Sequence, residues 1–267
     1  MTYAWQHSSI PAVMNPEIDA KLAQEVAFFR KWGYLVIDDV LSAAEIGMLR
    51  SMVDVVYDRP HKSNVSAGGK AMNRINVNDV MIYSLFEEDE RFVFLLDHAP
   101  VLRRVQALLG NCIQLHSAQA RVTQPGEPEQ RWHRDTPFPQ DPDGTPVGAG
   151  FGQIACAYYL DPLTDENGPL CILPGSHKAL FRPPESPVPF PDERRIYAQP
   201  GQIVMFDCYL FHRGCANSSN DRRRAVFVAY ENAWMKPREP HTGPILSALR
   251  AKGTPTQRML LNEVVSW

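Results

Sequence analysis

The chain has 267 residues, of which 44% are hydrophobic and 21% charged, and its formal net charge at pH 7 is −3. This composition is typical of a globular protein with one large apolar core and excludes a disordered or fibrous chain. A slightly acidic chain has no basic field to attract nucleic acid or an anionic membrane, so we expect neither partner. We expect a cytoplasmic protein, because no apolar run could span a bilayer and the N-terminus lacks a signal-peptide pattern.

Five cysteines are widely spaced along the chain and form no C-x-x-C pair. This spacing indicates neither a zinc knuckle nor a disulfide framework. Most of the cysteines lie in apolar runs, where a reduced thiol behaves as a small core residue. The pattern therefore favours a reducing compartment.

The first predicted helix covers residues 16–32. Asn15 is the expected N-cap, Pro16 suits the first helical position, and Gly33 is expected to end the helix. A short strand is predicted directly after it, over residues 34–38. The apolar face of the helix consists of Ile18, Leu22, Val26 and Phe29.

A second helix is predicted from Ser42 to about Tyr57, because Ser42 and Glu45 form a capping box. Residues 59–80 show no clear period and are predicted to be an irregular loop. The inward face of the second helix consists of Ile46, Leu49, Val53 and Val56. Further helices are predicted over residues 91–97 and 100–109.

The pattern changes to strands after Gly110. Short apolar or alternating runs are separated by stretches rich in proline, glycine, aspartate and asparagine, as in all-β domains. The predicted strands are residues 113–123, 152–160, 170–173, 202–206 and 225–231. Helices followed by strands predict one domain, a β-sandwich or jelly roll buttressed by N-terminal helices. Its parts would be helical support over about 16–110, a core over about 111–232 and a C-terminal extension over 233–267.

Three residues in two distant segments are candidate metal ligands. His133 and Asp135 follow a strand and a turn, and residues two apart in an extended segment point to the same face. A histidine and an aspartate beside a turn are, on their own, more often simple surface residues. His212 ends an apolar run, where a lone histidine is usually structural. Together, however, two histidines and a carboxylate are the set that binds iron(II) on one octahedral face.

Arg223, eleven residues after His212, starts the last predicted strand. A guanidinium grips a carboxylate in a bidentate fork, so Arg223 is suited to hold the far end of a dicarboxylate co-substrate. The alternative is that three consecutive arginines form a solvated strand end. We accept this alternative for Arg222 and Arg224, which should point to the opposite face of the strand.

These motifs, in this order, make the chain resemble the phytanoyl-CoA dioxygenase family of Fe(II)/2-oxoglutarate oxygenases. The resemblance runs from about Val26 to Asn232. It is carried by the segment Gly33-Tyr34-Leu35-Val36-Ile37, the capped helix from Ser42, His133-x-Asp135, Asn167-Gly168-Pro169-Leu170, Leu173-Pro174-Gly175-Ser176-His177, and then His212, Asn217, Arg223 and Ala225.

The resemblance implies a mainly β fold with flanking helices, in which the core is a double-stranded β-helix (a cupin-like jelly roll). It implies that His133, Asp135 and His212 bind iron, and that Arg223 pairs with the C5 carboxylate of 2-oxoglutarate. The cofactors would be Fe(II), 2-oxoglutarate and O2. Oxidative decarboxylation would release succinate and CO2 while a C–H bond of a small organic molecule is hydroxylated.

The resemblance also suggests residues at the co-substrate. Gln119 and Thr123 are expected near its C1 end. Several relatives carry a serine two residues after the distal histidine that also bonds the C5 carboxylate, and here that position is Gly214. Another hydroxyl, that of Tyr158 or Thr123, would have to replace it, or co-substrate binding would be looser.

Asp135 disfavours halogenation, because halogenases that resemble this family have a small residue in its place. Desaturation, ring closure and epimerisation use the same iron centre and stay open. So do a cupin-type metal enzyme without 2-oxoglutarate and a non-catalytic binding module. The expected substrate is a small molecule such as a secondary metabolite, amino acid or terpenoid. Candidate pocket walls are Phe138, residues 59–80, Tyr230 and Trp234, each of which is equally explained as core.

The remaining histidines receive no catalytic role. His177 lies in the Pro-Gly-Ser-His turn, where the family pattern makes it a loop residue at the mouth of the barrel. His116 and His98 have no partner by spacing, and we assign them no function.

Overall fold

The structure is a computed structural model that describes residues 18–59, 73–74, 79–136, 152–184 and 188–262. Two antiparallel sheets form its centre. The large sheet has the strand order β1-β8-β5-β10-β4-β3-β2, and the small one has the order β7-β6-β9. The large sheet consists of β1 (Tyr34–Ile37), β2 (Asn73–Arg74), β3 (Asp79–Ile82), β4 (Ile113–Thr123), β5 (Gln153–Tyr159), β8 (Ile203–Asp207) and β10 (Arg223–Asn232). The small sheet consists of β6 (Leu170–Ile172), β7 (Arg194–Ile196) and β9 (His212–Gly214).

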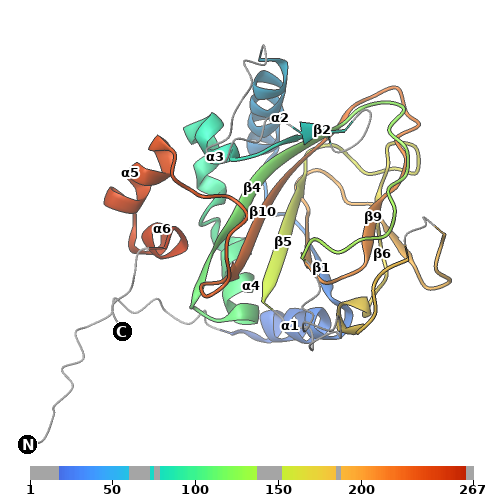
Figure 1. The fold of residues 1–267 in the computed structure, drawn as a ribbon, viewed down its shortest axis with the longest axis horizontal. Helices are drawn as coiled ribbons and strands as arrows, with labels where there is room; N and C mark the ends of the chain where they lie inside the picture. Colours follow the sequence, from blue (N-terminus) through green and yellow to red (C-terminus); the bar gives the residue numbers. More distant parts are fainter. Residues whose placement is uncertain (1–17, 60–72, 75–78, 137–151, 185–187, 263–267) are drawn as a thin grey trace, which may run out of the picture.

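Helices cover one face of the large sheet. Figure 1 shows α3 to α6 on the side of this sheet away from β6 and β9. The helical elements are α1 (Ala20–Trp32), α2 (Ala43–Asp58), α3 (Leu85–Glu88), the 3-10 helix η1 (Glu90–Leu95), α4 (Ala99–Leu109), the 3-10 helix η2 (Ser176–Lys178), α5 (Pro244–Lys252) and α6 (Pro255–Leu260). This is the mainly β fold with flanking helices and a jelly-roll core that the resemblance implied.

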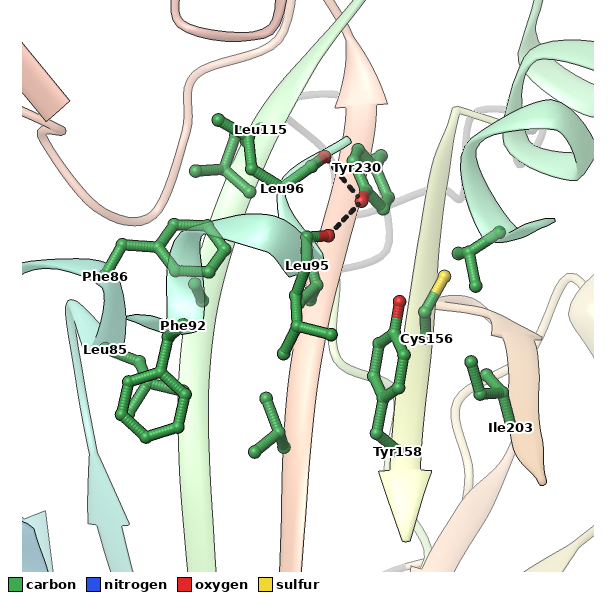
Figure 2. Packing of buried hydrophobic residues seen from close by; sticks show 14 of the residues in the cluster. Leu85, Phe86, Phe92, Leu95, Leu96, Leu115, Cys156, Tyr158, Ile203 and Tyr230 are labelled. Carbon is green, nitrogen blue, oxygen red and sulfur yellow. Dashed lines mark hydrogen bonds between the residues drawn. The ribbon is translucent and has the colours of Figure 1, made fainter. Parts of the chain in front are cut away.

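The main core lies between the helices and the large sheet. Along β10, Val226, Val228 and Tyr230 point into it and are fully buried. The hydroxyl of Tyr230 lies within hydrogen-bond distance of the carbonyl oxygens of Leu95 and Leu96, at 3.1 and 2.9 Å, and its one hydrogen is shared between them (Figure 2). Because successive residues of a strand face opposite sides, the intervening residues of β10 face the small sheet. That second face carries the candidate site.

The first helix begins later than the sequence predicted. Asn15 and Pro16 lie outside the described residues, and Ile18 is not helical and is 60% exposed. The N-cap is instead Asp19, whose carboxylate accepts from the Leu22 N–H at 2.8 Å. Gly33 ends the helix as predicted, with a φ of +81° in the left-handed region. Of the predicted apolar face, Leu22 and Phe29 are buried and Val26 is partly buried.

The capping box of the second helix is confirmed. The Ser42 hydroxyl accepts from the Glu45 N–H, and the Glu45 carboxylate accepts from the Ser42 N–H at 2.7 Å. The loop predicted over residues 59–80 is wrong where the structure describes it, because β2 and the start of β3 fall within it. The helix predicted over residues 91–97 is the 3-10 helix η1, and β7 and β9 were not predicted.

The C-terminal extension packs back onto the helical side of the molecule. Leu246 of α5 and Leu260 of α6 are buried in the main core. None of the described helices is long and apolar enough to cross a membrane. All five cysteines are free thiols, and only Cys112 is exposed.

Candidate metal centre

His133, Asp135 and His212 converge because the segment before β5 pairs with β9. His133 and His212 form an antiparallel bridge, in which each N–H donates to the carbonyl of the other at 3.0 and 3.1 Å. The Asp135 N–H donates to the Cys208 carbonyl at 3.0 Å, which fixes the backbone two residues after His133. One ligand atom from each of the three residues lies within 4.8 Å of the other two.

The two imidazoles are oriented so that both Nε2 atoms face the carboxylate. Nδ1 of His133 lies 3.0 Å from the Arg131 carbonyl, and Nδ1 of His212 lies 2.9 Å from the Leu210 carbonyl. A carbonyl only accepts, so each Nδ1 carries the hydrogen and each Nε2 offers a lone pair. Asp135 Oδ1 lies 3.6 Å from Nε2 of His212 and 4.0 Å from Nε2 of His133. This donor set fits a divalent metal with open coordination positions.

The electrostatics of the three residues also suit a cation. Burial lowers the pKa of His133 to about 4, and the neighbouring His212 adds to this effect, so His133 is neutral. Burial alone would raise the pKa of Asp135, but the charge of His212 and its hydrogen bond hold it well below its usual range. Burial opposes protonation of His212 as well, yet the charge of Asp135 outweighs it and raises the pKa of His212. A bound metal would therefore take the place of the proton that Asp135 and His212 attract.

The three residues line a cavity of about 250 Å³, whose walls come from both sheets. The large sheet contributes side chains from β4, β5 and β10, all on the face opposite the helical core. The small sheet and its flanking segment contribute His212, Gly214 and Leu170. A cavity of this size suits a small organic molecule.

Arg223 lies in this cavity at the first position of β10 and is 3% exposed. Its guanidinium donates to the Thr123 hydroxyl at 2.8 Å and to the Gly168 carbonyl. The register of the sheet places Arg223 directly opposite Thr123. A buried guanidinium in the same cavity as a candidate metal site is suited to bind a carboxylate of a metal-chelating molecule.

Comparison with known proteins decides the family. The family model for phytanoyl-CoA dioxygenase (PhyH) matches residues 29–225. The chain belongs to this family. It is accordingly a 2-oxoglutarate-dependent non-haem iron dioxygenase, whose cofactors are Fe(II), 2-oxoglutarate and O2.

Two curated relatives and a solved structure illustrate the similarity. An ectoine dioxygenase of Stutzerimonas stutzeri (strain A1501) is 24% identical, over 86% of this chain and 83% of the relative. An L-proline trans-4-hydroxylase of Streptomyces griseoviridis is 24% identical, over 88% of this chain and 94% of the relative. The crystal structure of HygX from Streptomyces hygroscopicus with nickel, 2-oxoglutarate and hygromycin B bound has a similar fold. Its TM-score is 0.67 at 14% identity, over 80% of this chain and 88% of HygX.

The arginines beside Arg223 point away from the cavity, as the alternation of the strand predicted. The prediction that Arg224 is solvated is wrong, because its side chain is only 16% exposed. It forms ion pairs with Asp54 at 2.8 Å and Asp161 at 3.1 Å. Arg222 is half-buried and lies 3.3 Å from Asp54. These arginines fasten α2 to the sheet on the side opposite the dioxygenase site.

The two residues expected at the C1 end of 2-oxoglutarate lie in different surroundings. Gln119 lines the cavity, and its side-chain amide donates to Glu239 at 3.3 Å. Thr123 lies against the guanidinium of Arg223, at the end where the C5 carboxylate is expected. Their roles toward the co-substrate stay predictions.

Gly214 stands where the family resemblance predicted a serine, and Gln130 lies beside it. The Gly214 N–H donates to Oε1 of Gln130 at 2.9 Å, and a Cβ at Gly214 would lie 3.0 Å from the same atom. Tyr158 does not replace the missing hydroxyl, because its side chain lies in the main core (Figure 2). Its hydroxyl lies 3.2 Å from Nδ1 of His98. The neighbouring Tyr159 lines the cavity instead.

Neither Tyr230 nor Trp234 lines the cavity, and for Tyr230 the structure has the core alternative that the sequence left open. Tyr230 belongs to the helical core, Trp234 is 75% exposed, and Phe138 lies outside the described residues. His177 is structural, as expected: it is buried against Gly33, away from the metal site. Sequence reasoning missed several polar residues that line the cavity, although alternation along the strands could have indicated some of them. They are His116, Ser117, Arg121, Gln130, Gln153 and Arg238.

Proposed function

We propose that this dioxygenase hydroxylates a C–H bond of a small organic molecule, with His133, Asp135 and His212 as iron ligands. Arg223 holds the C5 carboxylate of 2-oxoglutarate. With O2, the bound metal and 2-oxoglutarate supply the oxidising power, and succinate and CO2 are released. The observation that carries the proposal is the convergence of both Nε2 atoms and Oδ1 of Asp135 in the cavity that also contains the buried Arg223.

The protein itself orients the metal ligands and the arginine, and it excludes water from one side of the site. The Arg131 and Leu210 carbonyls hold the imidazoles in the ligating tautomer, so little reorganisation precedes metal binding. The guanidinium of Arg223 is held by Thr123 and Gly168 and is therefore preorganised for a bidentate contact. The apolar Phe206 ring packs 4.8 Å from the His212 ring and excludes water from that side.

The retained carboxylate favours hydroxylation over halogenation at this iron centre. Asp135 would be a metal ligand where a halide would otherwise bind, so transfer of a halogen is disfavoured. Desaturation, ring closure and epimerisation need the same ligands and differ in how the substrate is placed. A product 16 mass units heavier than the substrate distinguishes hydroxylation from all three.

The test is anaerobic titration of iron-loaded protein with 2-oxoglutarate, followed through the visible charge-transfer band of the chelate. The wild-type protein should develop the band, while Asp135→Ala and His212→Ala should lose both the band and bound iron after dialysis. His98→Asn is a matched control, because His98 contacts Tyr158 in the helical core and should leave both unchanged. A wild-type protein that binds iron without giving the band would favour a cupin-type enzyme that does not use 2-oxoglutarate.

A further inference from the structure

A β-bulge in β4 places in the cavity wall a histidine, His116, that the iron chemistry does not use. The pairing of β4 with β10 shifts between Ala229 and Tyr230: Ala229 lies opposite Ser117, but Tyr230 lies opposite Leu115. His116 is the extra residue, with no partner on β10. A bulge of this kind re-aims side chains, and here both His116 and Ser117 line the cavity while Leu115 stays in the core.

His116 forms a buried dyad with Glu231. Its Nδ1 lies 2.7 Å from Oε2 of Glu231. Glu231 is the penultimate residue of β10, and its carboxylate is fully buried. The other carboxylate oxygen accepts from the side-chain amide of Gln114 at 2.7 Å. A carboxylate held in this way accepts the Nδ1 hydrogen of the imidazole and fixes the ring.

The opposite nitrogen of the ring is buried and, among the residues that the structure describes, unsatisfied, so a ligand in the cavity reaches it after a small shift of the surrounding side chains. His116 is 9% exposed, and its Nε2 is buried and has no hydrogen-bond partner in the described part of the chain. Because an unsatisfied buried polar atom costs free energy, native proteins rarely keep one without a use. The ring belongs to the wall of the same cavity as the three metal ligands.

The register places this dyad far from the co-substrate arginine. Arg223 and Glu231 lie on the same face of β10, eight residues apart, which is roughly 26 Å along a strand. A five-carbon diacid held by Arg223 cannot reach that distance. The His116 end is therefore left to the molecule that is oxidised.

We propose that Nε2 of His116 binds a hydroxyl group of the substrate and thereby sets which C–H bond faces the metal. This inference rests on the proposed function. A hydroxyl fits because it donates and accepts, and so satisfies the imidazole whether or not Nε2 is protonated. A carboxylate at this position would face the charge of Glu231, and Glu239 lies beside the same strand, where it accepts from the Ala118 N–H at 3.1 Å. His116 contacts the substrate itself and takes no part in binding the metal or 2-oxoglutarate.

The test measures binding of three probes with the same ring: cyclohexanol, cyclohexanecarboxylate and methylcyclohexane. Saturation-transfer NMR on the zinc-loaded protein with 2-oxoglutarate gives their affinities without turnover. His116→Asn keeps a donor for Glu231 but removes the atom at the Nε2 position, so cyclohexanol should bind about tenfold more weakly. His116→Gln returns a polar atom near that position and should recover part of the loss, which a merely structural role would not show. His98→Asn, at the start of α4 and on the helical side of the sheet, should bind all three probes like the wild type.

The outcomes separate this inference from the proposed function. If the wild-type protein does not bind 2-oxoglutarate, the proposed function itself is overturned. With 2-oxoglutarate bound, unchanged cyclohexanol affinity in His116→Asn, or no cyclohexanol binding by the wild type, would overturn the role of His116. Preference for the carboxylate probe would also overturn it, and would point to Arg121 and Arg238, which line the cavity as well.

Discussion

Replacement of Arg223 by alanine tests the co-substrate site most directly. Arg223 is 3% exposed, so its charge is screened little by water or salt. Its guanidinium donates to the Thr123 hydroxyl and the Gly168 carbonyl, which fix its position in the cavity. The alanine variant should therefore bind 2-oxoglutarate much more weakly, while its thermal stability changes little.

The expected magnitude follows from the contacts that a bidentate carboxylate makes. Each hydrogen bond to a charged group contributes about 1.5–3 kcal/mol, so loss of two costs roughly 3–4 kcal/mol once the partly open site admits water. At about 1.4 kcal/mol per decade, the Kd for 2-oxoglutarate should rise roughly 100- to 1,000-fold. Arg223→Lys keeps the charge but not the fork, and should weaken binding only about tenfold.

The assay is the anaerobic titration of iron-loaded protein, with metal content and thermal unfolding measured on the same samples. Arg222→Ala is the matched control, because its side chain points to the opposite face and pairs with Asp54. It should bind 2-oxoglutarate like the wild type. If Arg223→Ala is folded, holds iron and binds 2-oxoglutarate within twofold of the wild type, the assignment of Arg223 is refuted.

Three further substitutions test the fold around the site. Ser42→Ala should lower the free energy of unfolding by about 1 kcal/mol in urea, because it removes the helix cap, while Ser51→Ala on the exposed face of α2 should not. Arg224→Gln should cost about 3 kcal/mol because it breaks two largely buried ion pairs, whereas Arg222→Gln should cost under about 1 kcal/mol; equal costs would contradict this. Burial raises the pKa of Asp207 to about 7, so folding must retain a proton that the unfolded chain releases above about pH 4. Wild-type stability should therefore fall relative to Asp207→Asn as the pH rises from 4 to 7, by on the order of 4 kcal/mol; parallel pH profiles would count against it.

Local patterns were sufficient for much of the fold. The strand predicted over residues 113–123 has the bounds of β4, and the capping box at Ser42 starts α2 as expected. Such features depend on neighbours within a few residues, where alternation and capping act directly. His133, Asp135 and His212 meet as predicted, because the family motifs carry the information on long-range pairing that spacing alone lacks.

Elements that depend on distant partners were missed. β9 has only three residues, and it exists because it pairs with β6 and bridges to His133. β7 has two exposed arginines, so no apolar alternation marks it as a strand. The start of α1 was misplaced because Asn15 and Asp19 are both good caps, and the choice depends on tertiary packing that the local sequence does not contain.

The bulge in β4 shows why site residues are harder to predict than core residues. Strict alternation would place Ser117, Gln119 and Arg121 on the cavity face, and the structure agrees. The same alternation would put Leu115 in the cavity and His116 in the core, where a lone histidine has no evident use. One extra residue reverses this assignment for every position before it, and only the pairing with β10 shows where it lies. The spacing of His116 and Glu231 in the sequence, 115 residues apart, could not have joined them. Alternation therefore predicts the facing of strand residues reliably between bulges. Where alternation assigns a polar residue to the core, a β-bulge nearby should be considered.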